Sequence, residues 1–359
     1  SFATLKQTPN SVWSGMLPDP VWASNWSSIT GHVSSVVTGG VRDTGWGAIA
    51  GAPSGFQAWR STTVPHNNNT FIAPGNVMID GQMIASIHYG ASLSATLTRM
   101  AQFTRCSCFE LPTTAMLLVL PTGVNPNTTV TMSAYWVTAI RNWDTMSTNR
   151  FGCVVQDLTV QSFSAYPIIL AGLPGVVFRR NRALSIGGRY RFDLSYWEGN
   201  GSDIIGGCRN ALVEDYYAEC IEDSGMSTQP VGATVNGGDQ TDVTVRRVVA
   251  KDTGIGPIES VSQLSTGQNL NGVRIEEVDG TRIRNYEQGA LRPDSVNGGG
   301  GGLSFNQGMS GSATPTSILG EVVVRGLRVR SRAFWLSARS TTRAKVYADR
   351  IVAYNDGTA

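Results

Sequence analysis

The chain has 359 residues, of which 28 are basic and 26 acidic, so its formal net charge at pH 7 is +2. A charge balance this close to neutral excludes a strongly electrostatic nucleic-acid binder, and 41% hydrophobic residues exclude a disordered chain. Its 41 glycines, together with frequent Ser, Thr and Asn, indicate an all-β chain with many turns.

Cysteine and histidine are too few to suggest a metal or disulfide framework. The five cysteines are an odd number without a C-x-x-C pair, and three histidines make a zinc site improbable on composition. The longest apolar run, 115–120, is far too short to cross a bilayer, and the first ten residues lack the apolar core of a secretory signal. We therefore expect no metal, no cofactor, no membrane insertion and no nucleic-acid partner.

The first 70 residues differ from the rest of the chain. They contain five of the nine tryptophans, which are Trp13, Trp22, Trp26, Trp46 and Trp59. This is too aromatic for a disordered linker. Two interpretations stay open, a cap over one end of a core or a docking surface for a partner. We divide the chain into this cap or docking region, 1–70, and a second region, 71–359.

Seven segments of the second region share one pattern. Each has apolar residues at an anchor position and two residues before it, which is the period of a half-buried strand. The anchors are Val155, Phe178, Val213, Val245, Ile275, Val324 and Ala348. In most segments the next apolar position comes three residues later instead of two, which predicts a corner between two short strands. Anchor spacings of 23 to 49 residues are those of the coils of a right-handed parallel β-helix with inserted loops.

Charged residues occupy the predicted corner, and from the second coil onward their sign alternates nearly coil by coil. Successive corners read Gln156-Asp157, Arg179-Arg180, Glu214-Asp215, Arg246-Arg247, Glu276-Glu277, Arg325-Gly326 and Asp349-Arg350. Since opposite charges attract across neighbouring strands, we expect an interstrand salt ladder that fixes the register. Glu219 and Lys251 are expected to pair in the same way.

A cluster of acidic residues suggests that the chain could also be an enzyme. Paired carboxylates beside aromatic rings are how glycosidases cut sugar chains. The candidate catalytic residues are Glu214, Asp215, Glu219, Glu222 and Asp223. The candidate sugar-binding residues are Tyr196, Trp197, Tyr216 and Tyr217. The competing interpretation assigns Glu214 and Asp215 to the ladder.

The repeated segments, such as NALVEDYYAECIEDSG and DVTVRRVVAKDTG, resemble the pectate-lyase-like right-handed parallel β-helix superfamily. They are most similar to its bacteriophage members, the tailspikes and virion-surface spikes. The polygalacturonase signatures Asn-Thr-Asp, Gly-His-Gly and Arg-Ile-Lys are missing, as is the GDGxxDDTxAI-like opening of phage tailspikes. The resemblance therefore assigns no catalytic residue.

The resemblance implies a virion structural protein, either a capsid decoration or a spike, assembled in the host cytoplasm. We expect a homotrimer that contacts other virion proteins through residues 1–70 and binds a host-surface polysaccharide. The alternative function is a tailspike depolymerase, a glycoside hydrolase that uses the paired carboxylates. A glycan-binding module that does not cleave is a third.

Overall fold

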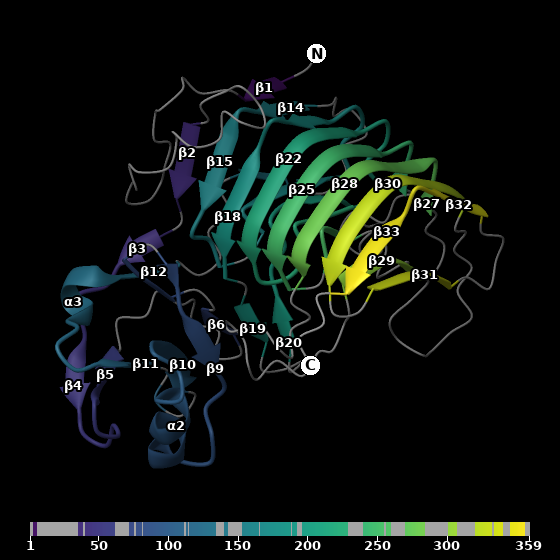
Figure 1. Cartoon of the computed structure of the whole chain (residues 1–359). Helices are drawn as coiled ribbons and strands as arrows, with labels where there is room; N and C mark the ends of the chain where they lie inside the picture. Colours follow the sequence, from purple (N-terminus) through teal and green to yellow (C-terminus); the bar gives the residue numbers. More distant parts are fainter. Residues whose placement is uncertain are drawn as a thin grey trace.

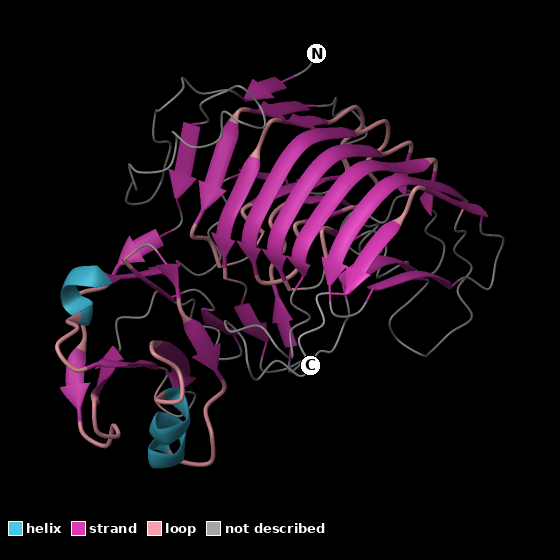
Figure 2. Cartoon of the chain, in the orientation of Figure 1, coloured by secondary structure: helices cyan, strands magenta, loops and turns pink. Residues whose placement is uncertain are grey.

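The computed structural model describes most of the chain in separate segments. The described residues are 3–5, 35–38, 40–61, 72–74, 77–80, 82–110, 113, 115–133, 140–142, 153–164, 166–187, 189–191, 196–228, 240–254, 256–259, 270–283, 301–306, 320–331, 334–339 and 345–355. Strands dominate, as the composition predicts, and the fold is all-β with two short helices in the described part (Figure 2).

The largest element is a twelve-stranded parallel sheet, drawn in Figure 1 as a row of nearly aligned arrows. Its main path is β1 (Ala3–Leu5), β14 (Cys153–Gln156), β17 (Val177–Arg179), β22 (Leu212–Ile221), β25 (Thr244–Thr253), β28 (Val273–Ile283), β30 (Glu321–Ser331) and β32 (Lys345–Asp349). Shorter strands extend the same rows, and they are β2 (Ser35–Thr38), β15 (Leu158–Gln161), β18 (Arg182–Ile186) and β33 (Val352–Asn355).

The predicted anchors stand in one column across this sheet. Each pairs directly with the next, from Val155↔Phe178 to Val324↔Ala348. Six of them are buried, and the column lies within one hydrophobic core made largely of Val, Ile and Ala. Period-2 spacing and repeat alignment therefore predicted both the strands and their register.

The predicted corner is a left-handed backbone position. In every row the second residue after the anchor has a positive φ, between 52° and 66°. These residues are Asp157, Arg180, Asp215, Arg247, Glu277, Gly326 and Arg350. One left-handed residue bends the chain and shifts the in–out alternation by one, which explains the three-residue step in the apolar pattern. Only one of the seven is glycine, so six accept the steric cost of a Cβ there.

Further parallel strands return on other faces. One sheet joins β13 (Ile140–Asn142), β16 (Ile168–Ala171), β21 (Asp203–Ile205), β23 (Met226–Ser227) and β26 (Ile258–Glu259). Two pairs complete this part of the chain, β24 (Gln240–Thr241) with β27 (Leu270–Asn271), and β29 (Gly301–Asn306) with β31 (Phe334–Arg339).

Antiparallel sheets occupy the segment between residues 40 and 133. One joins β4 (Gly47–Ile49), β5 (Phe56–Ser61), β11 (Ala115–Pro121), β10 (Cys106–Glu110) and β9 (Ala85–Ile87), where only the last pair is parallel. The other joins β3 (Gly40–Arg42), β12 (Val130–Ser133), β7 (Val77–Ile79) and β8 (Gln82–Met83). The helices α2 (Leu93–Met100) and α3 (Pro126–Thr129) belong to this segment, whose two cores are separate from that of the long sheet.

The expected boundary at residue 71 falls within this segment. Antiparallel strands lie on both sides of that position, and after residue 133 the chain continues into the parallel strands β13 and β14. A small antiparallel sheet of β6 (Ile72–Pro74), β19 (Arg189–Arg191) and β20 (Tyr196–Glu198) joins the two parts. These antiparallel strands carry no repeat, so an alignment of repeats does not detect them.

The N-terminal strands fit the cap interpretation in part. β1 and β2 pair in parallel with β14 and β15 and so cover the first edge of the long sheet. Trp46 is buried and Trp59 half-buried in the antiparallel segment, where both belong to a hydrophobic core. Trp13, Trp22 and Trp26 lie outside the described residues.

Asn181 joins two rows at the inner side of the corner. Its fully buried side chain accepts a hydrogen bond from the Leu158 backbone N–H at 3.0 Å and donates one to the Val155 carbonyl at 2.9 Å. Both backbone groups belong to the preceding row, where the bend interrupts the regular ladder. An interior amide thus replaces the hydrogen bonds that the corner removes.

Replacing this amide is expected to cost more than the loss of one contact. Asn181→Ala leaves a buried N–H and a buried C=O without their side-chain partner, so we expect the free energy of unfolding to fall by about 2–4 kcal/mol. Chemical denaturation followed by circular dichroism measures this change. Thr244→Ala, a half-buried position on β25, is the comparison variant. Equal destabilisation by both variants would contradict the assigned role of Asn181.

Candidate functional site

The candidate site is the outer face of the long sheet beside its corner. The residue after each anchor also forms a column, in the register Gln156↔Arg179↔Glu214↔Arg246↔Glu276↔Arg325↔Asp349. The left-handed corner residues form a second column next to it. The two columns bring the predicted corner charges together on one face.

The corner arginines form ion pairs with carboxylates of the preceding row. Arg180 Nε lies 2.7 Å from Asp157 Oδ1, and its Nη2 lies 3.0 Å from Oδ2. Arg247 repeats this two-pronged contact with Asp215, at 2.6 and 3.1 Å. The same Arg247 Nη2 also lies 2.8 Å from Glu214 Oε2. The predicted ladder is confirmed for these three carboxylates.

Neighbouring columns add further contacts of the same kind. Arg246 Nη2 lies 2.7 Å from Glu214 Oε2, so Glu214 is shared by two guanidinium groups. Lys251 Nζ lies 3.0 Å from Glu219 Oε1, as expected from their alignment. Arg179 Nε donates to the Gln156 side-chain oxygen at 2.8 Å, a neutral version of the same contact.

The arginines hold these carboxyl groups in the ionised form. Partial burial of Glu214 acts to raise its pKa, but the hydrogen bonds from Arg246 and Arg247 outweigh it and the pKa is lowered. The hydrogen bond from Arg247 is the main cause of the lowered pKa of Asp215. Arg247 in turn has a raised pKa, chiefly through Asp215. A general acid needs the opposite, a carboxyl group that keeps its proton near neutral pH.

The five candidate catalytic carboxylates fall into separate places. Glu214 and Asp215 lie at the corner, and Glu219 lies four residues further along β22. Glu222 and Asp223 follow the end of that strand and are only 5% and 8% exposed. Asp215 and Glu222 are seven residues apart, a reach of at most about 23 Å, and the left-handed residue Cys220 bends the chain between them.

Asp223 has a structural contact near the chain's next turn. Its Oδ2 accepts a hydrogen bond from the Gly199 backbone N–H at 3.4 Å. Among the residues with described placement, no group of three or more His, Cys, Asp or Glu side chains is arranged to hold a metal ion.

Tyr216 corrects one of the expected sugar-binding assignments. Its ring is fully buried and packs against Phe178, with ring centroids 5.5 Å apart. Its hydroxyl donates to the Gly225 carbonyl at 3.0 Å and lies 3.1 Å from Ser202 Oγ. Burial raises the pKa of this hydroxyl. The corner at Asp215 turns Tyr216 inward, so it cannot stack on a polymer outside.

The other predicted aromatic residues have different surroundings. Tyr217 is half-buried, and its hydroxyl donates to the Glu219 carboxylate. In register it stands beside Val249, and Val249 beside Asp279. Tyr196 and Trp197 belong to β20, whose backbone pairs with β19, and their side chains lie outside the described part of the structure.

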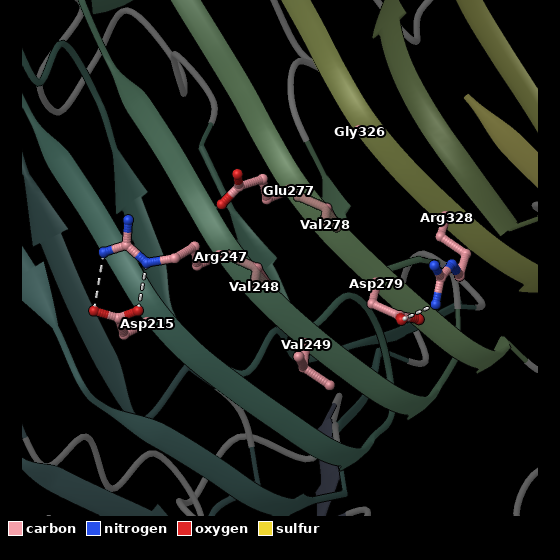
Figure 3. Close-up of a pocket in the computed structure, with 9 residues that line it drawn as sticks. All are labelled: Asp215, Arg247, Val248, Val249, Glu277, Val278, Asp279, Gly326 and Arg328. Carbon is pink, nitrogen blue, oxygen red and sulfur yellow. Dashed lines mark hydrogen bonds and ion pairs between the residues drawn. The ribbon is translucent and has the colours of Figure 1, made fainter. Parts of the chain in front are cut away.

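A shallow hollow opens on this face at the later rows (Figure 3). It has a volume of about 390 Å³, and it is lined by Asp215, Arg247, Val248, Val249, Glu277, Val278, Asp279, Gly326 and Arg328. Two ion pairs flank it, Arg247 with Asp215 and Arg328 with Asp279, the latter at 3.4 Å. Sequence reasoning did not predict this hollow; the signal for it is Gly326, the one uncharged residue among the seven left-handed corner positions.

Comparisons with known proteins add little to this picture. No protein-family model and no curated protein matches the chain. Among solved structures it is similar to one described as "The complex structure of XylC with xylose", with 8% sequence identity and a TM-score of 0.38. The match covers 88% of this chain but only 59% of that one. A likeness this low carries no argument about function. In the described residues, no helix is both long and apolar enough to span a membrane.

Removing one ladder arginine tests the contribution of the corner. Arg247→Met breaks the contacts to Glu214 and Asp215, and because these groups are partly exposed we expect a loss of only about 0.5–2 kcal/mol in unfolding free energy. Denaturant unfolding at pH 7 measures it. Arg274→Met, which removes an exposed arginine from β28, is expected to change stability far less.

The ladder also predicts a pH dependence. Because the folded-state pKa values of Glu214 and Asp215 are lowered, their stabilisation is fully present above the ordinary carboxyl range, about pH 4. It is lost as the pH falls through the lowered folded-state values. The stability difference between wild type and Arg247→Met should therefore shrink below about pH 4. A difference that stays constant down to pH 2 would rule out ionised carboxylates as its cause.

Proposed function

We propose that this chain is a non-catalytic structural protein, a right-handed parallel β-helix shaft displayed on a bacteriophage particle as a capsid decoration or spike. The observation that carries the proposal is the run of seven rows in one parallel register, held at the corner by arginine–carboxylate contacts. Such a shaft is stiff because each row is hydrogen-bonded to the rows on both sides.

The electrostatics of the corner favour a structural role over glycan cleavage. Glycoside hydrolysis needs one carboxyl group with a raised pKa and a second carboxylate nearby. Glu214 and Asp215 have lowered pKa values, and Glu219 is paired with Lys251. Glu222 and Asp223 are buried away from any polymer that lies along the outer face.

Binding of a host-surface polysaccharide without cleavage is the second part of the proposal. Tyr217 has an aromatic face, and Glu219 and Lys251 beside it carry hydrogen-bonding groups. An aromatic platform flanked by a few polar groups is the usual composition of a small-molecule or sugar site. Val249 and Asp279, which follow Tyr217 in register on the next two strands and are half-buried like it, would extend this surface toward the hollow.

Assembly completes the proposal. We infer a homotrimer of such shafts on the virion, assembled in the host cytoplasm, with other virion proteins contacted through residues 1–70. Two features support side-by-side packing and end-on docking. The long sheet offers an extended outer face, and β1 and β2 bring the N-terminal region to its first edge.

Release of oligosaccharides separates the structural function from the enzymatic one. Incubation of the purified protein with host capsular polysaccharide or lipopolysaccharide is expected to give co-sedimentation but no increase in reducing ends. Tyr217→Ala should weaken co-sedimentation roughly fivefold to tenfold, the usual value of one aromatic contact. Glu276→Gln, which lies elsewhere on the same face, should leave it unchanged. Released oligosaccharides that disappear in Glu222→Gln or Asp223→Asn would establish the depolymerase instead.

A further inference from the structure

In the column of left-handed corner residues, the contacts follow a rule that is broken once. The acidic corner residue of one row pairs with the corner arginine of the next, as Asp157 does with Arg180 and Asp215 with Arg247. The third pair of this series would join Glu277 to residue 326, which is glycine. Within the part of the chain that the structure describes, no ion pair reaches Glu277, whose side chain is exposed.

Packing does not require glycine at this corner. A Cβ added to Gly326 would have its nearest neighbour, the Glu277 backbone nitrogen, at 3.5 Å, an ordinary van der Waals contact. The φ of Gly326 is +66°, and Arg247 and Arg350 adopt φ values of +53° and +54° at equivalent positions. The backbone therefore accepts an arginine there, and the missing side chain leaves open space.

That space is the hollow shown in Figure 3, where Glu277 lies on the strand between those of Arg247 and Gly326. Of the five charged groups in its lining, Arg247 and Arg328 are paired with Asp215 and Asp279. Glu277 is thus an unneutralised carboxylate, and Val249, which lies next to Asp279 in the same lining, offers half-buried apolar surface. A ligand that complements both would combine an apolar stem with a cationic head.

We propose that this hollow is a docking site for an arginine side chain of another protein chain. The guanidinium group takes the place left by Gly326 and binds the Glu277 carboxylate, while the aliphatic stem covers Val249. An arginine matches the planar, two-pronged contact seen at Asp157 and Asp215. A divalent cation does not match, because one free carboxylate beside two guanidinium groups is a poor oxygen cage.

The docking site rests on the proposed function in one respect, that a shaft on a particle has protein neighbours. It concerns a different part of the face from Tyr217 and needs no glycan. The two proposals therefore fail separately. Oligosaccharide release would refute the proposal that the shaft is non-catalytic, but it would not bear on the docking site. The experiment below tests only the binding of arginine at Glu277.

A matched pair of peptides tests the site directly. The probes are Ac-Gly-Arg-Gly-NH₂ and its citrulline analogue, which has the same shape but no charge. Saturation-transfer NMR suits weak ligands of a protein this large. We expect transfer to the arginine methylenes of wild type, and a signal weaker by roughly fivefold for the citrulline peptide, the effect of losing one charge-assisted pair.

Two variants identify the place of binding. Glu277→Gln should weaken the arginine signal by the same factor, and Glu321→Gln, another exposed glutamate, should not. Gly326→Arg should also abolish the signal because the chain's own arginine then fills the hollow, and its new ion pair with Glu277 should offset the steric cost of a Cβ at this positive φ. This second variant reports on the site even if Glu277→Gln fails to fold. Equal signals for both peptides, an unchanged signal in both variants, or a neutral oligosaccharide whose signal depends on Glu277 would overturn the proposal.

Discussion

Parallel stacking in register is the constraint on which the rest of this structure depends. Each side chain of the long sheet stands on its equivalent in the next row, about 4.8 Å away along the hydrogen bonds. Inside, this repetition favours small and β-branched residues, and the core consists largely of them. Outside, the same repetition would stack like charges, which repel. A charged column is stable only if its sign alternates, and the Glu214 and Arg246 positions do so.

The repeat made much of the long sheet predictable. Apolar residues with period 2 identified the strands, and aligning them gave the register of all seven anchors. The three-residue step at the corner has a single physical cause, a left-handed residue between two strand halves. The charge alternation followed from the same alignment. These features could be predicted from the sequence because each of them repeats along the chain, so every coil supports the alignment of the others.

Features that occur once were not accessible in this way. The antiparallel strands between residues 40 and 133 do not repeat, so the boundary at residue 71 had no support from periodicity. The strands of the second parallel sheet, such as β23 and β26, have two residues each, too few for a pattern. The predicted sugar-binding role of Tyr216 was wrong for another reason. The corner step places it in the inward column, but its nearness in sequence to Glu214 and Asp215 made it look like part of a surface cluster.

On this face, the contacts that stabilise the stacking of the rows also make the carboxyl groups poor proton donors. An arginine that holds two rows in register also lowers the pKa of the carboxyl groups it contacts, and so removes them as proton donors. A series of rows with paired corner charges is therefore stiff and offers no carboxyl group that could act as a general acid. Recognition of a charged partner needs a corner charge that is not already paired. A guanidinium and a carboxylate bound to each other have few hydrogen-bonding positions left for another molecule. Glycine at position 326 leaves such a charge at the cost of one exposed pair, a small loss of stability for a shaft whose rows are held mainly by backbone hydrogen bonds and buried apolar columns.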